Sequence, residues 1–341
     1  MALQASGQIK YSEIIAEFGT PNSGGIGEYR ISENVGSLSN LPLDTGVPQS
    51  GQIKFSDFYS KKLNHIVDLH SIGNNTSRQN AKDRWNNGNV HIVGSTKTGK
   101  TQPPDTIDDR VIINVNATIS STKGTQTHCA LRTGTWDSNT TLEIEIGTSG
   151  KLYGSGGDGG TGGSANETPG TDGQTGSSAL GIQYPCTINN LGVIQSGYGG
   201  GGGGGGNTRT TGGGKKGGAT TNGSSGGGGG GGAGLPAGSA GGVSTPLSQG
   251  GGSAGSAGQA GSLSGQASGG AGGSEAGAGG NSSPVNNSAT KADNGATASG
   301  AASPGTGGNN GYAIITNQGS APSLSGGGTL TGRTITSTNP T

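Results

Sequence analysis

The feature that most restricts the fold of this chain is its glycine content, which changes abruptly along the sequence. Of 341 residues 79 are glycine, with 16 of them in residues 1–150 and 63 in residues 151–341, about one residue in three. Leu, Ile, Val and Phe are distributed the other way, with 33 in the first part and 17 in the second. A segment with so few apolar side chains cannot offset chain entropy by burying a conventional core. The sequence therefore predicts two segments of different composition and different packing, which meet near residues 147–150.

Three physical states suit the glycine-rich part: a disordered linker, collagen, or packed extended helices. Collagen is excluded because a strict three-residue glycine period survives only from Gly252 to Gly261. A flexible linker remains the alternative, since glycine loses the most entropy on ordering. The glycines come in blocks separated by short inserts of other residues, however, and a flexible spacer does not require such inserts. The blocks are residues 154–163, 197–206, 212–218, 226–234, 250–261 and 269–280.

The inserts between the glycine blocks consist of turn-forming and apolar residues. Examples are Asn207 to Thr211, Leu235-Pro236 and Ser283 to Asn286, and they read as turns that reverse a back-and-forth chain. Extended segments of three residues per turn make no internal hydrogen bonds, so their amides are free to bond neighbouring segments. The pattern therefore predicts a polyglycine-II sandwich held by backbone hydrogen bonds.

The first part of the chain shows the alternation of half-buried strands. Val111 to Ile119 and Leu142 to Ile146 place apolar residues at every second position. Weaker strand candidates are residues 65–72 and 90–94, and residues 78–85 are a candidate helix. We expect a mainly β unit, a β-sandwich or layered sheet of four to six strands, with antiparallel pairing as the default.

A repeat occupies the N-terminal end. Ser-Gly-Gln-Ile-Lys at residues 6–10 recurs at residues 50–54, and an aromatic residue, serine and an acidic residue follow each copy. The serine and the acidic residue favour a helix start, and the first helix is expected from Glu13 to Phe18, ending at Gly19. The connection, residues 20–48, is sparse in apolar residues. The end is therefore a candidate anchor that docks onto a partner, with a small self-contained cap as the alternative.

Charge and composition exclude several classes of function. Nineteen basic and 19 acidic residues balance, which argues against nucleic acid or an anionic membrane as partner. No apolar run is long enough for membrane insertion, and residues 1–10 lack a signal-peptide pattern, which predicts cytoplasmic synthesis. Cys129 and Cys186 are expected to be free thiols, although the sequence leaves their pairing open.

The chemical motifs are weak. Gly94 to Thr101 matches the phosphate-binding loop pattern, but Pro103 and Pro104 forbid the helix that would have to start at Lys100. Glu143 and Glu145 share a strand face without an aromatic-lined sugar site. The four histidines share no metal-ligand spacing. We therefore expect no catalytic residues, no cofactor and no metal.

The run from Leu142 to Gly154 leads from a strand into glycine blocks. It resembles the boundary in tail-fibre receptor-recognising adhesins of T-even-type bacteriophages, where a β-rich attachment domain continues into a polyglycine-II sandwich. The repeated Ser-Gly-Gln-Ile-Lys resembles short motifs near the N-termini of phage tail and fibre proteins. It departs from the usual front end of that adhesin, which leaves the mode of attachment open.

The resemblance implies a non-enzymatic virion protein with four parts. Residues 1–62 are the anchor, 63–150 the β-rich attachment domain, 151–311 the glycine-rich domain and 312–341 a C-terminal strand segment. The implied partners are other tail or fibre proteins, bound through residues 1–62 with 63–150 as a second contact, and a host surface protein or polysaccharide. A homotrimer and a single copy on a trimeric shaft both fit.

Loops on a rigid scaffold concentrate recognition. The expected receptor-binding residues are Thr208, Arg209, Thr210, Leu235, Pro236, Leu247, Leu263, Pro284 and Val285. One rival hypothesis is a purely structural virion component, such as a baseplate, collar or capsid fibre. Another is an enzyme that degrades surface polysaccharide through Glu143 or Glu145. The sequence names neither receptor nor host.

Overall fold

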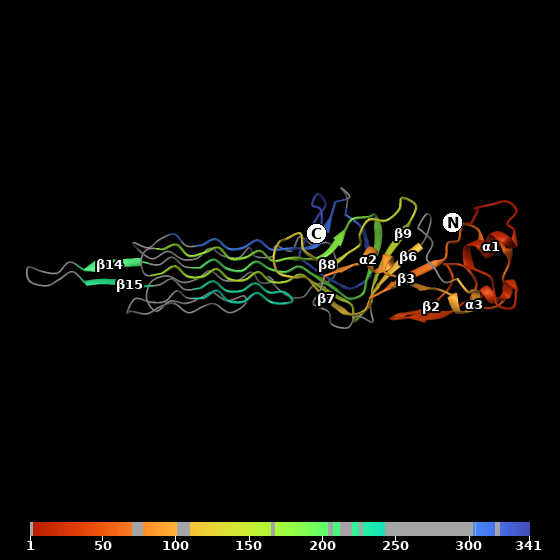
Figure 1. Ribbon diagram of the computed structural model, residues 1–341, viewed down its shortest axis with the longest axis horizontal. Helices are drawn as coiled ribbons and strands as arrows, with labels where there is room; N and C mark the ends of the chain where they lie inside the picture. The colour runs from red at the N-terminus through yellow and green to blue at the C-terminus, as the bar shows by residue number, and fades with distance from the viewer. Residues whose placement is uncertain are drawn as a thin grey trace, which may run out of the picture.

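Strands and extended segments make up most of the structure, a computed structural model (Figure 1). It describes residues 3–69, 78–100, 110–164, 168–203, 207–211, 220–224, 228–242, 303, 305–317 and 321–341, with residues 207–211 and 220–224 described by their backbone. The protein is mainly β, as predicted. The helices are α1 (Tyr11–Phe18), α2 (Ala81–Asn86) and α3 (Ser95–Thr98), with 3-10 turns η1 (Ile26–Tyr29) and η2 (Phe55–Phe58).

Three sheets form the strand-rich unit within the described residues. The first contains, in spatial order, β17 (Ser323–Ser325), β12 (Cys186–Asn190), β9 (Thr141–Ile146), β6 (Arg110–Val115), β3 (Asn64–Asp68) and β5 (His91–Ile92). The second contains β18 (Thr329–Thr331), β13 (Val193–Gln195), β10 (Lys151–Tyr153) and β7 (Thr118–Ser120). The third contains β19 (Arg333–Ile335), β16 (Tyr312–Thr316), β11 (Ser178–Ile182), β8 (Cys129–Arg132) and β4 (Gln79–Asn80). Two hairpins lie outside them, β1 (Glu33–Val35) with β2 (Leu38–Leu41) and β14 (Asn207–Thr211) with β15 (Thr220–Ser224).

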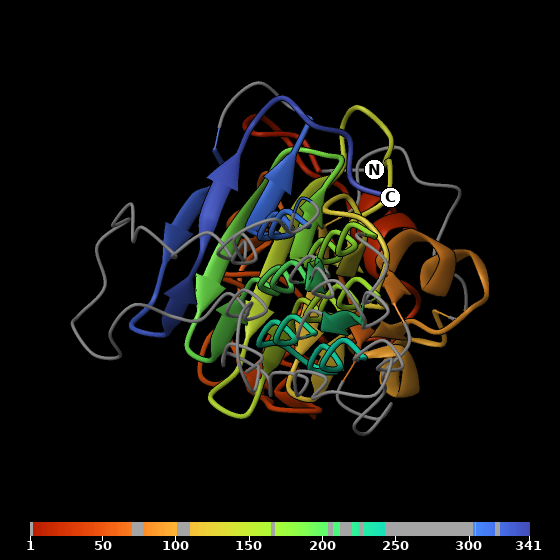
Figure 2. The same ribbon diagram turned by 90° about the vertical axis from the view of Figure 1, so that its left-hand side faces the viewer.

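The antiparallel pairing expected for these strands is wrong. The chain visits the first, second and third sheet in turn, as in β6, β7 and β8, and then begins the next coil with β9. Neighbours within a sheet are therefore separated by strands of the other two sheets and run in the same direction, apart from the antiparallel pair β3–β5. Figure 2 shows the successive coils side by side, with the C-terminal coil in blue at one edge. A two-layer sandwich does not describe this arrangement, because three sheets face one core.

Equivalent apolar residues of successive coils stack in columns that fill the interior. Ile113, Ile144 and Ile188 are partners in the first sheet, and Ile119, Leu152 and Ile194 form a column in the second. All six belong to one buried cluster, to which the third sheet adds Leu131, Leu180 and Ile314. The alternation read from the sequence thus marks the interior face, while the corner after Val115 divides the predicted run 111–119 between two sheets.

The N-terminal residues form a second apolar cluster on the outer face of the first sheet. Phe18, Tyr29 and Phe58 are fully buried and their rings meet edge to face. The cluster continues into Ile66 and Ile112, which point away from the interior of the coils. Most apolar groups of this end are therefore buried within the chain itself, with Phe55 as an exposed exception. The connection 20–48 contributes more to the core than its composition suggested.

Each repeat copy begins a helical turn in the same way. Helix α1 ends at Phe18 before Gly19, as predicted, but begins at Tyr11 rather than Glu13. The serine is not the cap. Instead the carboxylate three residues into each turn accepts a hydrogen bond from the backbone N–H that precedes it, Glu13 from Lys10 and Asp57 from Lys54, both at 2.7 Å. The two copies therefore use the acidic residue to satisfy a free amide.

The glycine-rich segments are two inserts in the coils. One connects β10 to β11 and the other connects β13 to β16, so both leave after the second sheet and return to the third. The four-part division predicted at residues 62/63, 150/151 and 311/312 remains a proposal about folding units. The sheets themselves draw strands from both sides of Gly150 and of Gly311.

Backbone hydrogen bonds join the glycine-rich segments side by side, and we call the described part of this assembly, residues 154–164, 168–177, 197–203, 228–242 and 305–311, the glycine body. Gly157 and Gly160 donate to the carbonyls of Tyr198 and Gly201, each at 2.8 Å. Neighbouring amides turn to different segments, since Gly156 donates instead to Pro236. The donors recur every three residues, and the segments run along the long axis of the molecule (Figure 1).

In each segment of the glycine body, glycine occupies the positions of the three-residue turn that face the backbone of an adjacent segment. A Cβ on Gly156 or Gly157 would lie about 2 Å from the carbonyl oxygen of Gly232 or Gln174, and this central segment has two glycines in three. The peripheral segment 236–242 has Gly238 and Gly241 against its neighbours, while Ala237 and Ala240 are exposed. Glycine is needed where backbones approach closely.

Acid is expected to destabilise the coils through His65. This side chain is 1% exposed, and its ring lies 5.3 Å from that of Trp85. Burial lowers its pKa from 6.5 to about 4. Below pH 6.5 His65 becomes protonated in the unfolded chain but stays neutral in the folded chain. The free energy of unfolding therefore falls, by roughly 3 kcal/mol once the pH is below 4. Between pH 7 and 4 the unfolding temperature should fall more steeply for the wild type than for His65→Leu. Parallel falls in the two unfolding temperatures would contradict a role of His65 in acid sensitivity.

No helix within the described ranges combines the length and the apolar character that crossing a membrane requires.

Candidate functional site

The hairpin of β14 and β15 lies at the end of the molecule farthest from α1 (Figure 1). Its strands are antiparallel, with Thr208 opposite Gly223, Arg209 opposite Asn222 and Thr210 opposite Thr221. Three of the predicted receptor-binding residues, Thr208, Arg209 and Thr210, therefore belong to one strand at the tip. The sequence predicted a turn here, and the structure shows a paired strand.

The glycine body supports this end with hydroxyl pairs as well as backbone bonds. Thr161 and Thr171 are joined through their Oγ1 atoms at 3.0 Å, and Ser164 and Thr168 at 2.6 Å. These pairs hold the two arms on either side of the reversal predicted around Pro169. The far end is thus built on segments whose spacing is set by short contacts.

Leu235 and Pro236 lie at the opposite end of the glycine body. The N–H of Leu235 donates to the carbonyl of Gly154 at 2.9 Å, and the carbonyl of Pro236 accepts from Gly156 at 2.9 Å. Gly154 directly follows β10, so this turn sits beside the coils rather than beside the hairpin. The structure does not bring Leu235 and Pro236 together with Thr208 to Thr210. Leu247, Leu263, Pro284 and Val285 lie outside the described residues.

A charged contact ties the glycine body to the coils. Lys123 Nζ lies 2.5 Å from Asp158 Oδ1, and the same oxygen accepts the N–H of Ser239 at 2.6 Å. Burial raises the pKa of Asp158, but the hydrogen bonds and the charge of Lys123 outweigh burial, so the pKa is lowered overall. No motif in the sequence singles out this contact, because its members are more than 30 residues apart.

The two glutamates considered for sugar hydrolysis serve as structural partners. Glu143 binds Arg110 through both carboxylate oxygens, at 2.9 and 3.0 Å. Glu145 accepts a hydrogen bond from Asn189 at 2.8 Å, and burial raises its pKa. Both carboxylates are thus bound by side chains of the neighbouring strands β6 and β12.

The phosphate-loop match does not form a phosphate cradle in the described residues. Helix α3 lies inside the matching segment and ends at Thr98, where Gly99 is left-handed (φ 66°), while residues 101–109 lie outside the described residues. The ammonium of Lys100 donates instead to the carbonyl of Ala16.

Burial raises the pKa of both Cys129 and Cys186 to about 12, and both are free thiols. Nowhere in the described ranges do three or more His, Cys, Asp or Glu side chains gather as metal ligands.

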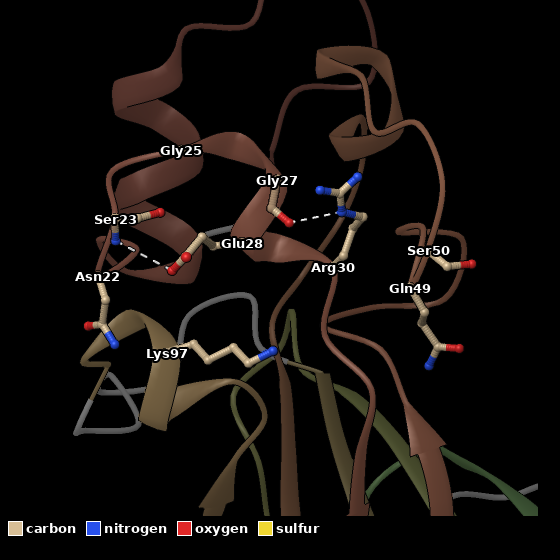
Figure 3. A pocket seen from close by; sticks show the side chains of 9 residues that line it. All are labelled: Asn22, Ser23, Gly25, Gly27, Glu28, Arg30, Gln49, Ser50 and Lys97. Carbon is tan, nitrogen blue, oxygen red and sulfur yellow. Dashed lines mark hydrogen bonds between the residues drawn. The ribbon is translucent and has the colours of Figure 1, made fainter.

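A polar hollow of about 710 Å³ opens at the N-terminal end (Figure 3). It is lined by Asn22, Ser23, Gly25, Gly27, Glu28, Arg30, Gln49, Ser50 and Lys97. These residues come from the connection between the repeat copies, from the second copy and from α3. The sequence analysis did not single out this hollow.

The described residues thus form an elongated β-rich protein, with the glycine body between the coils and the β14–β15 hairpin (Figure 1). The sequence model of the family described as phage tail fibre adhesin Gp38 matches residues 81–335. The protein therefore belongs to the phage tail fibre adhesin Gp38 family, as the resemblance implied, and such an adhesin is a component of the virion's tail fibre.

Two further comparisons were made. One solved structure, the gp37-gp38 adhesin tip complex of the bacteriophage S16 long tail fiber, is 18% identical, with 94% of this chain and 95% of that chain covered. The TM-score of 0.29 is too low to indicate a shared fold. Among curated proteins no match was found.

Proposed function

We propose that this protein is the terminal adhesin of a tail fibre and that it recognises a receptor on the host surface through the far end of the glycine body. The observation that carries the proposal is the position of the β14–β15 hairpin, which lies at the opposite end of the long axis from the N-terminal cluster (Figure 1). In a tail-fibre adhesin, one end has to meet the fibre and the other the cell.

We further propose that the glycine body is a polyglycine-II sandwich that acts as a stiff spacer. The three-residue recurrence of lateral donors supports this, as does the match between glycines per turn and neighbours. A stiff spacer reduces the entropy lost when the tip binds, because the tip is already held in place.

Residues 1–62 are proposed to face the fibre, with the coils from residue 63 onward as a second contact. The proposed partners are other fibre proteins on one side and a host surface protein or polysaccharide on the other. A non-enzymatic role is part of the proposal, since Glu143 and Glu145 are engaged in structural pairs. Synthesis in the host cytoplasm, followed by assembly into the virion, completes it.

Binding of the fluorescently labelled full chain to susceptible and resistant bacteria tests the receptor proposal. The wild type should bind susceptible cells only. Replacing Thr208, Arg209 and Thr210 together by glycine should weaken that binding at least tenfold, equivalent to about 1.4 kcal/mol, because the contact surface of β14 is removed. Unfolding temperatures of both proteins show whether the fold is retained.

The matched control replaces Leu235 and Pro236 by glycine. These residues lie at the near end of the glycine body, so binding should stay within twofold of the wild type. If the turn variant also loses binding, the receptor contact extends along the body, as the sequence analysis expected. A folded wild-type chain that ignores every susceptible cell would instead favour a purely structural virion component.

A further inference from the structure

The polar hollow lies at the end of the molecule that faces away from the hairpin. Eight of its nine lining residues precede residue 81, where the match to the adhesin family begins; Lys97 on α3 is the ninth. Figure 3 shows the side chain of Lys97 extending from α3 beneath the segment that carries Glu28 and Arg30. The hollow is therefore a feature of the N-terminal unit rather than of the family-matched part.

At this end, the acidic side chains have hydrogen-bond partners among the described residues, whereas one basic side chain of the hollow does not. Each carboxylate of residues 3–62 accepts a hydrogen bond or ion pair from the chain itself. These are Glu13, Glu17, Glu28, Glu33, Asp44 and Asp57. In the hollow, the ammonium of Lys97 has no hydrogen-bond partner among the described residues. The hollow therefore holds two cations, Arg30 and Lys97, and one carboxylate, Glu28, which accepts the N–H of Ser23 at 3.4 Å, so its net charge is positive.

Arg30 supplies the second cation and is held in place by backbone groups. Its Nε donates to the carbonyl of Gly27 at 3.0 Å, and Nη1 donates to the carbonyl of Gly51 in the second repeat copy. Three N–H groups remain, one on Nη1 and two on Nη2, and none of them is paired with a carboxylate of the described residues. A guanidinium fixed in this way is preorganised for a carboxylate ligand.

An exposed aromatic side chain of the N-terminal unit packs against Tyr11, which is hydrogen-bonded to the segment that lines the hollow. Phe55 is 42% exposed, and its ring lies 6.3 Å from that of Tyr11. The hydroxyl of Tyr11 donates to Gly24, which lies between the lining residues Ser23 and Gly25. Aromatic residues and arginine are the types that concentrate binding energy in protein interfaces.

We propose that this hollow docks an acidic, extended segment of the neighbouring tail-fibre protein. The proposal deepens the fibre-facing role given above and rests on it. Arg30 and Lys97 bind carboxylates of the segment, while the amide and hydroxyl groups of Asn22, Gln49 and Ser50 hydrogen-bond its backbone. A hollow of about 710 Å³ holds several residues, far more than a single inorganic anion occupies.

A labelled decapeptide of alternating Asp and Gly is the probe, and its counterpart with Asn in place of Asp is the control. The full chain should bind the Asp peptide, with an affinity that falls as salt screens the charges, and should bind the Asn peptide at least tenfold more weakly. Lys97→Glu should weaken binding of the Asp peptide at least tenfold, and Arg30→Gln should act in the same direction.

Lys151→Glu is the matched control, because Lys151 is an exposed lysine on β10, outside the hollow. It should leave peptide binding unchanged. Equal binding by the wild type and Lys97→Glu would overturn the proposal. So would equally tight binding of a ten-nucleotide oligothymidylate, since the hollow would then recognise any polyanion.

A second measurement separates this proposal from the receptor proposal. Lys97→Glu should still adsorb to susceptible cells as an isolated chain, but fewer copies should be found on virions from a phage complemented with the variant. Normal incorporation of Lys97→Glu into virions would overturn the docking proposal alone. If the wild-type chain does not adsorb to susceptible cells, the receptor proposal is wrong, while the result with the peptide still holds.

Discussion

Replacing Gly241 by alanine will destabilise the glycine body by about 3 kcal/mol or more, at the upper end of the cost of overpacking. A Cβ at this position would lie 2.0 Å from the carbonyl oxygen of Gly160 and 2.8 Å from that of Gly159. Both atoms belong to the backbone of the central segment, which cannot rotate away as a side chain would. Segment 236–242 must therefore move outward and lose the bonds Gly241 to Gly229 and Gly159 to Ser239.

The neighbouring glycine provides the control for this experiment. A Cβ on Gly242 would meet its nearest atom, Thr161 Cγ2, at 4.0 Å, which is an ordinary contact. Gly242→Ala should therefore leave the fold intact and raise stability by about 0.4–1 kcal/mol, because alanine restricts the unfolded chain. Thermal unfolding and amide exchange at Gly159 and Gly229 measure both variants. Equal unfolding temperatures for the two would show that the body is not close-packed.

Replacing Arg110 by alanine will loosen the N-terminal unit from the coils and cost about 3 kcal/mol, the low end of the range for breaking a buried ion pair. Arg110 Nη1 lies 2.6 Å from Asp44 Oδ1, and Nη2 binds Glu143. Burial lowers the pKa of Arg110, but Glu143 and Asp44 outweigh burial and raise it above its ordinary value. Without the guanidinium, the Asp44 side chain, which is 8% exposed, loses the cation that it contacts.

Chemical unfolding followed through the fluorescence of Trp85 and Trp136 measures this effect. Arg110→Lys should fall between the wild type and Arg110→Ala, because one ammonium cannot replace a fork that binds two carboxylates. The exposed Lys151→Ala is the control and should change stability by less than about 0.5 kcal/mol. An equally small change for Arg110→Ala would mean that the other contacts, such as the apolar packing of Ile66 and Ile112 and the hydrogen bond from Asn64 to Leu43, join the two units without the ion pair.

Much of the local structure followed from residue patterns. The alternation at residues 111–119 and 142–146 located β6, β7 and β9, and Gly19 marked the end of α1. Periodicity reports which face of a segment is buried, whatever the fold around it. It carries no information on what lies beside the strand, so the sheet partners and their parallel direction remained open.

The candidate site was less accessible to sequence reasoning. Turn-forming residues between glycine blocks mark reversals, but they do not tell which end of the body each reversal occupies. The hairpin at Thr208 to Thr210 and the turn at Leu235-Pro236 have similar local signals and lie at opposite ends (Figure 1). Arg30 and Lys97 carry no motif at all, because the hollow arises from segments that are distant in the sequence.

The sequence by itself determined that the chain is mainly β and that a glycine-rich part follows residue 150, because composition and periodicity are properties of the local chain. Only the tertiary structure decided that three parallel sheets share one core and that the glycine-rich segments are inserts within their coils. It also decided which end of the body each reversal occupies. These features depend on which distant segments pack together, and backbone hydrogen bonds between glycines are equally possible for many pairings until the coils set the position of each segment.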